Sequence, residues 1–262
     1  MTMKTLCTLF TFMLLLFCAC QNPQKTLKIA ATSIPHAEML AAIKSDLAYD
    51  GISLEIIEVD DYNIPNRALV DKEVDANFFQ HSPYLASQIQ MFSYPITALT
   101  NVHIEPMGIY SEKIKTLQEL NDTSTILLPN DPINEARAVA LLHKSGIIEL
   151  DDPENLQASI FNIIENPKHI TFVKTDAPLL PEMLKDVDAA VIPAKIALLN
   201  NLKPALDALT LEDETSHFTT VIAIRKNNEN KKELIALKKH MTSQKMRHHI
   251  QDKYKGDMVC AF

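Results

Sequence analysis

The sequence predicts an α/β protein in which helices cover largely parallel sheets. Short apolar segments that fit strands alternate along most of the chain with longer segments whose apolar residues recur at helical spacing. Candidate helix starts carry Ser-Pro or Asp-Pro, as at Ser82 and Asp131, where the first residue can cap the helix and proline loses no helical hydrogen bond. Repeated strand–helix units form parallel sheets with helices on their faces.

The first part of the chain contains three predicted strand–helix units. Apolar or alternating segments predict strands at 27–31, 53–59 and 74–79. Caps and helical spacing predict helices at 33–47 and 82–90. Between them, a polar turn at 61–66 precedes a short predicted helix that ends near Lys72. Two further apolar strands, at 96–99 and 107–110, surround an expected hinge.

The second part continues the alternation. Apolar runs predict strands at 125–128, 170–173, 189–192 and 218–224. Helical spacing predicts a helix capped by Asp131, helices near 156–165 and 178–185, and one long amphipathic helix over 230–253.

Composition and motifs exclude several classes of function. A formal net charge of −8 disfavours nucleic acid or an anionic membrane surface as a partner, and four glycines cannot form a phosphate-binding loop. No nucleophile elbow, carboxylate pair or metal-ligand spacing stands out, so we expect no catalytic residue, metal or cofactor. The histidines His36, His81 and His103 are scattered along the sequence, and those at 240, 248 and 249 are expected on a solvated helix face.

The N-terminus has the pattern of a bacterial lipoprotein. Lys4 precedes an apolar run over 6–17 that is too short to span a bilayer, and FCAC-QN resembles a lipobox with Phe17 in place of the usual Leu. This pattern implies a signal peptide over 1–19, lipidation of Cys20 and a tether over 20–26. An ordinary secretory signal and an uncleaved anchor are the alternatives. Cys260 would be the remaining cysteine, so no internal disulfide is expected.

Polar and aromatic residues follow three of the predicted strands. They are Asp61 and Tyr62, then 79–81, then 130–137. Ligands in parallel α/β folds bind beyond the carboxyl ends of strands, so these segments are predicted to share one site.

Asn134 and Arg137 are the candidates for binding a carboxylate. They are three residues apart in the first turns of a predicted helix, so they project from one face near its positive end. A guanidinium, an amide and spare backbone donors suit a small carboxylate. The same residues also fit a surface arginine on an ordinary capped helix.

Several motifs closely resemble the NlpA-type methionine-binding lipoproteins, which are substrate-binding components of methionine-uptake ABC transporters. They include VDDYNIPNRAL, VDANFFQHSPYL, PNDPINEARAVALL and TDAPLLPEMLKDVDAAVI. The resemblance covers essentially the whole mature chain. It implies a periplasmic-binding-protein-like fold, in which two α/β lobes enclose a ligand cleft. One lobe would comprise 27–105 plus 218–262, and the other would comprise 106–217.

The resemblance also implies a function and a site. The function is that of a non-catalytic, lipid-anchored protein of the bacterial cell envelope that delivers methionine or a related amino acid to an inner-membrane ABC permease. Arg137 should hold the ligand carboxylate with help from Asn134, and an aromatic wall for the side chain should comprise Tyr62, Phe79, His81 and Tyr84. Aromatic faces suit a thioether. Each residue also has a purely structural interpretation. Phe79 and Tyr84 could be core aromatics, and His81 could be a capping or core histidine. Tyr62 could stabilise its own turn.

One segment departs from the family pattern. Where the family has an Asn-containing stretch followed by Tyr-Ala, this chain has Pro193 to Ala197, whose Pro and Ala side chains cannot donate a hydrogen bond. Losing such a bond to a charged ligand group costs about 1.5–3 kcal/mol, or roughly one to two decades of affinity. A methionine derivative, a small dipeptide, another amino acid or a protein partner is therefore an alternative to methionine. Lys195 is expected to be exposed to solvent, or else to supply a second cation.

Overall fold

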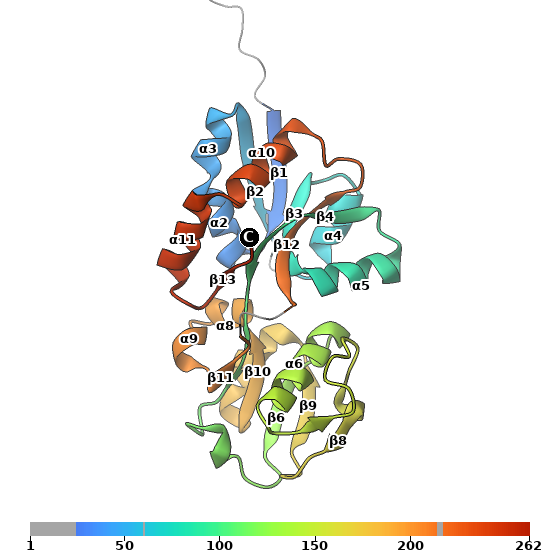
Figure 1. The fold of residues 1–262 in the computed structure, drawn as a ribbon, viewed down its shortest axis with the longest axis vertical. Helices are drawn as coiled ribbons and strands as arrows, with labels where there is room; N and C mark the ends of the chain where they lie inside the picture. Colours follow the sequence, from blue (N-terminus) through green and yellow to red (C-terminus); the bar gives the residue numbers. More distant parts are fainter. Residues whose placement is uncertain (1–24, 60, 214–216) are drawn as a thin grey trace, which may run out of the picture.

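The computed structural model describes residues 25–59, 61–213 and 217–262, so the expected signal peptide and Cys20 lie outside the described residues. It confirms the predicted fold class, because the described chain forms two α/β lobes, one above the other in Figure 1. Among the described residues, no helix is both long and apolar enough to cross a membrane.

The upper lobe in Figure 1 is built on a six-stranded sheet in the order β13-β4-β12-β3-β1-β2. Its strands are β1 (Lys25–Ala31), β2 (Ile52–Glu58), β3 (Ala76–His81), β4 (Ile96–Ile104), β12 (Thr219–Arg225) and β13 (Val259–Cys260). β1 is parallel to β2 and β3, whereas β12 is antiparallel to β3 and β4. The sheet is mixed because β12 enters it on the return of the chain from the other lobe.

The lower lobe has a five-stranded sheet in the order β11-β5-β10-β6-β9. Its strands are β5 (Met107–Tyr110), β6 (Thr125–Pro129), β9 (Thr171–Thr175), β10 (Ala189–Pro193) and β11 (Thr210–Leu211), beside a separate pair, β7 (Glu149–Leu150) and β8 (Ile163–Glu165). β6 is parallel to β9 and β10, as the strand–helix repeats predict.

Helices cover both faces of each sheet (Figure 1). They are α2 (Glu38–Ala42), α3 (Lys44–Tyr49), α4 (Ile64–Val70), α5 (Ser82–Phe92), α6 (Pro132–Lys144), α7 (Leu180–Met183), α8 (Ala194–Leu199), α9 (Pro204–Asp207), α10 (Lys232–Met241) and α11 (Gln244–Tyr254). Side chains alternate across β1, so Ile29 packs with Leu237 of α10 while Ala30 packs with Leu69 and Leu85 of α4 and α5. The carboxyl-terminal half of β1 is thus buried on both faces of the sheet.

Three predicted helices differ from the structure. The long helix over 230–253 is two helices, because the Ser243 side chain accepts a hydrogen bond from the backbone N–H of Met246 and starts α11 anew. The region 156–165 is a short helical turn followed by β8, and its Phe161 is 88% exposed, so no core holds this segment as a helix. The predicted helix over 33–47 is divided into a turn at Ser33–Ala37, α2 and α3.

Candidate functional site

All six predicted ligand-binding residues line one cavity between the two lobes. The complete lining is Tyr62, Phe79, Gln80, His81, Tyr84, Glu105, Asn134, Arg137, Pro193, Lys195 and Thr220. Tyr62 follows β2, Phe79 and His81 end β3, and Arg137 lies on the helix that follows β6. The cavity is therefore at the carboxyl ends of strands, where the sequence places it. The sequence reasoning missed one charged group in the lining, Glu105, and gave Lys195 as a second cation only as an alternative to exposure.

Arg137 is a buried part of the cavity wall, 3% exposed, so its interpretation as a surface arginine is wrong. Its Nε donates to Glu212 Oε1 at 2.8 Å, and its Nη2 pairs with Glu212 Oε2 and donates to the backbone oxygen of Glu105 at 2.7 Å. Its Cζ also lies 4.5 Å from the centroid of the Phe218 ring. These contacts fix the orientation of the guanidinium.

The predicted cap of α6 is present and also orients Asn134. Asp131 Oδ1 accepts from the Asn134 backbone N–H at 2.9 Å, and its Oδ2 accepts from Asn134 Nδ2 at 2.9 Å. The amide oxygen of Asn134 is then turned towards His81 of the other lobe, 3.2 Å from His81 Nε2. One side chain at the start of α6 thus both caps the helix and sets the face that Asn134 presents to the cavity.

His81 is both a capping residue and a contact between the lobes. Its Nδ1 accepts from the backbone N–H of Tyr84 at 3.1 Å, so its Nε2 carries the proton that faces Asn134 Oδ1. Burial, and then the positive charge of Arg137, lowers the pKa of His81 to about 3. His81 is therefore neutral at physiological pH, and the capping role considered from the sequence is present together with a place in the cavity.

Tyr62, Phe79 and Tyr84 pack against one another as one aromatic wall. The ring centroid of Tyr62 lies 6.5 Å from that of Phe79 and 5.9 Å from that of Tyr84, in tilted and edge-on arrangements. Burial raises the pKa of both tyrosine hydroxyls, and the Tyr84 hydroxyl donates to the Tyr62 backbone oxygen at 3.4 Å. The wall is apolar and preformed, as a thioether or alkyl side chain requires.

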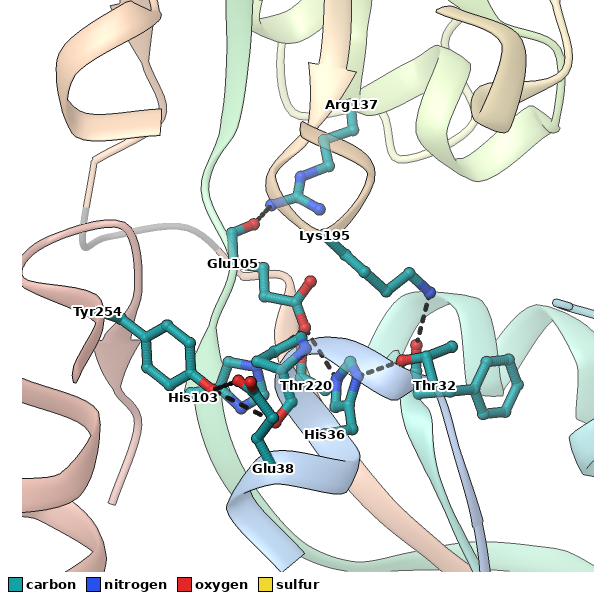
Figure 2. Close-up of polar contacts among 11 residues, drawn as sticks. Thr32, His36, Glu38, His103, Glu105, Arg137, Lys195, Thr220 and Tyr254 are labelled. Carbon is teal, nitrogen blue, oxygen red and sulfur yellow. Dashed lines mark hydrogen bonds and ion pairs between the residues drawn. The ribbon is translucent and has the colours of Figure 1, made fainter. Parts of the chain in front are cut away.

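Glu105, at the crossing between the lobes, places a carboxylate in the cavity. Its Oε1 lies 2.8 Å from His36 Nε2 and 2.9 Å from His103 Nε2, and both imidazoles are fully buried (Figure 2). Burial raises the pKa of the Glu105 carboxyl, but the two imidazoles together hold it well below its usual range. Burial lowers the pKa of His36 to about 4. An ionised carboxylate thus lies against two imidazoles, one of which is hydrogen-bonded to it, and histidines that are scattered in the sequence converge on it.

His36, His103 and Glu105 are also groups that could ligate a metal ion. Two ligands on a tetrahedral zinc ion, each about 2.1 Å from the metal, lie roughly 3.4 Å apart. The imidazole nitrogens lie 2.8 and 2.9 Å from the carboxylate oxygen, which are hydrogen-bond lengths. His103 Nε2 is hydrogen-bonded to Glu105 Oε1, whereas His36 Nε2 lies in close contact with the same oxygen.

Lys195 is buried, at 4% exposure, so its expected exposure to solvent is wrong. It lies in the first turn of α8, directly after β10, and this position turns its side chain into the cavity. Its Nζ donates to the backbone oxygen of Phe79 at 3.4 Å and lies 4.1 Å from the centroid of the Tyr62 ring. The segment that departs from the family pattern therefore adds a cation to the cavity.

Comparison with known proteins agrees with this geometry. A family model described as NlpA lipoprotein matches residues 27–262. Outer membrane lipoprotein 3 of Mannheimia haemolytica is 36% identical over 92% of each chain, and the methionine-binding lipoprotein MetQ of Bacillus subtilis is 36% identical over 91% of this chain and 89% of its own. A solved nutrient-binding protein from Burkholderia cenocepacia, bound to methionine, is 37% identical, with a TM-score of 0.86 over 90% of this chain and 100% of its own. The chain therefore belongs to the NlpA lipoprotein family.

Proposed function

We propose that this protein is the substrate-binding component of an ABC transporter and captures methionine or a closely related amino acid between its lobes. One observation carries the proposal: a single cavity holds a fixed guanidinium, an ionised carboxylate and an aromatic wall. These are the complements of the three parts of an amino acid with an apolar side chain. The methionine-binding relative and the methionine-bound solved structure support this ligand class.

Each part of the ligand has a proposed partner. The ligand carboxylate binds Arg137 and the second N–H of the Asn134 amide, whose first N–H donates to Asp131, and the ligand ammonium binds the carboxylate of Glu105. The side chain lies on the wall formed by Tyr62, Phe79, His81 and Tyr84. Because Glu212 already balances the charge of Arg137, the guanidinium contributes directed hydrogen bonds more than net attraction.

Closure of the cleft is the proposed mechanism. The aromatic wall belongs to the proposed lobe at 27–105 plus 218–262, whereas Arg137 and Asn134 belong to the proposed lobe at 106–217. A ligand that contacts both lobes favours the closed state, which the inner-membrane permease would recognise. We further propose that Cys20 carries the lipid that holds the protein in the bacterial envelope, and that the ligand is released chemically unchanged.

Calorimetry with truncated ligands tests the proposal. Methionine should bind with one-to-one stoichiometry. Methioninamide, which lacks the carboxylate, and 4-(methylthio)butyrate, which lacks the ammonium, should each bind at least about ten-fold more weakly. If none of the twenty amino acids gave a heat of binding, the proposed function would be wrong.

A variant complements the ligand series. Arg137→Ala should abolish binding of carboxylate ligands, and unchanged affinity would refute the assignment of Arg137. Because this variant also removes an ion-pair partner of Glu212, its folding should be checked by circular dichroism. Truncating the ligand leaves the protein intact, so the comparison of methionine with methioninamide is the cleaner measurement.

A further inference from the structure

The exposed side of α10 carries an apolar residue in the middle of a group of lysines. Ile235 is 54% exposed. Every residue three or four positions from it along the chain is an exposed lysine, namely Lys231, Lys232, Lys238 and Lys239. Because side chains at this spacing are neighbours on a helix surface, the four ammonium groups surround the isoleucine. The opposite side of α10 packs into the core of the upper lobe.

Tyr49 adds an exposed aromatic ring next to these residues. It lies at the end of α3 and is 93% exposed. α3 packs beside α10, and Asp50 Oδ2 lies 2.8 Å from His240 Nε2, so the ends of the two helices are joined. We call Tyr49, Ile235 and the four surrounding lysines the basic face.

The basic face lies beside Lys25, where the described chain begins. Lys25 Nζ pairs with Glu233 Oε1 of α10 at 2.5 Å, and Lys25 is also in register with Ile52, just after the turn that follows α3. Figure 1 shows this end of the upper lobe pointing away from the other lobe. Cys20 precedes Lys25 by five residues, which span at most about 18 Å. A lipid on Cys20 would therefore hold the basic face close to the bilayer.

The charge near this face differs from the charge of the whole molecule. Residues 231–255 include eight lysines and arginines but only two acidic residues, although the chain has a formal net charge of −8. The acidic residues beside the face are paired with basic groups: Glu233 with Lys25, Asp50 with Lys239 and His240, and Asp46 with Lys245. At physiological ionic strength the Debye length is about 8 Å, so the charges of the other lobe are screened from this face. The net charge disfavours an anionic surface as a partner of the whole molecule, but not of this face.

We propose that the basic face docks on a bilayer surface that contains anionic phospholipid, next to the point where the N-terminus is anchored. The inference goes beyond the proposed function and takes its geometry from the proposed lipid on Cys20. Lysine side chains are attracted to anionic headgroups, while Ile235 and Tyr49 are side chains that enter the interfacial region of a bilayer. The upper lobe then rests on the membrane, and the other lobe lies farther from it.

A single fluorescent probe tests the docking. The chain has no tryptophan, so Tyr49→Trp introduces one within the basic face and keeps an aromatic ring there. The lipid-anchored protein is placed on vesicles of phosphatidylcholine alone, or of phosphatidylcholine with phosphatidylglycerol as about one third of the lipid. On the anionic vesicles only, the emission should shift to shorter wavelength and be quenched by brominated phosphatidylcholine. Raising the salt concentration from about 0.1 M to about 1 M should reverse both effects, because the Debye length falls from about 10 Å to about 3 Å.

Two double variants of the Tyr49→Trp protein make the test specific. Lys232→Gln with Lys238→Gln removes two charges of the basic face, and the ratio of docked to undocked protein on anionic vesicles should fall about ten-fold or more. Lys115→Gln with Lys185→Gln removes two exposed lysines of the other lobe and should leave this ratio unchanged. Circular dichroism checks that both variants fold.

The same tryptophan emission on both kinds of vesicle, or an equal loss of docking in the two double variants, would overturn the proposal. Amino-acid binding, which calorimetry measures separately, would be unaffected by that result. Failure of the proposed lipid looks different, because the protein would then sediment with the anionic vesicles and not with the neutral ones. That outcome would still support the basic face as a docking surface.

Discussion

At the residue scale, the buried charges of the cavity are balanced by specific neighbours. Arg137 is paired with Glu212, and Glu105 rests on His36 and His103. Removing one member of such a group takes away the main neighbour that compensates a buried charge, which costs several kcal/mol in typical cases. These pairs hold the ligand-binding groups in position before a ligand arrives.

The neutral state of buried His36 predicts acid sensitivity. Burial lowers its pKa from 6.5 to about 4, so between these values the unfolded chain binds a proton that the folded chain does not. The free energy of unfolding should therefore fall as the pH is lowered from 6.5 towards 4, by up to about 3 kcal/mol from this group at about 1.36 kcal/mol per pKa unit. Urea unfolding at a series of pH values measures it.

Two variants make the pH prediction specific. His36→Gln keeps an N–H donor for Glu105 but cannot titrate, so its unfolding free energy should fall less steeply over the same range, with His81 still contributing. His248→Gln, at an exposed site, should follow the wild type. A slope in His36→Gln equal to that of the wild type would exclude this role for His36.

At the element scale, helix caps determine both boundaries and site geometry. Asp131 starts α6 and orients Asn134, and Ser243 starts α11 far from the cavity. The same kind of interaction therefore affects binding in one place and only stability in the other. This difference gives a matched pair of variants.

Asp131→Ala should lower both stability and affinity. Loss of the cap costs about 1 kcal/mol, and Asn134 loses the carboxylate that fixes its amide, so the ligand Kd should rise several-fold. Ser243→Ala should cost a similar free energy of unfolding and leave the Kd unchanged. Urea unfolding and calorimetry measure the two quantities, and an unchanged Kd in Asp131→Ala would show that Asn134 needs no such support.

At the scale of the whole molecule, the lobes meet through the residues that line the cavity. His81 contacts Asn134, Lys195 contacts Phe79, and Arg137 contacts Glu105 at the crossing of the chain. A ligand between these groups links the two lobes further. Binding should therefore stabilise the molecule as one unit.

This linkage predicts a defined gain in stability. Ligand at about 100 times its Kd should raise the free energy of unfolding by about 2.7 kcal/mol, in a single transition. The chain has no tryptophan, so far-ultraviolet circular dichroism in urea is the suitable measurement. Methioninamide at the same concentration should stabilise much less. A ligand effect on only one of two separate transitions would contradict binding between the lobes.

Local patterns in the sequence were enough to predict the strand–helix alternation, the Asp131 cap and the positions of Tyr62, 79–81 and 130–137 beyond strand ends, whereas Tyr84 was added by the family resemblance. These features depend on periodicity and on hydrogen bonds within a few residues, so they can be derived locally. The continuation of one helix past Ser243 was predicted wrongly, because helical spacing persists across a cap and does not mark the break.

The charges that share the cavity could not be predicted from the sequence, because they come together only in the folded chain. Glu105 meets His36 through the pairing of distant strands, Glu212 reaches Arg137 from the returning chain, and Lys195 is buried because α8 begins at the cleft. None of these contacts has a local signal, since each depends on strand order and on how the two lobes face each other. Burial lowers the pKa of His36, and the two imidazoles lower the pKa of Glu105, so the charge of the Glu105–histidine group depends on these tertiary contacts.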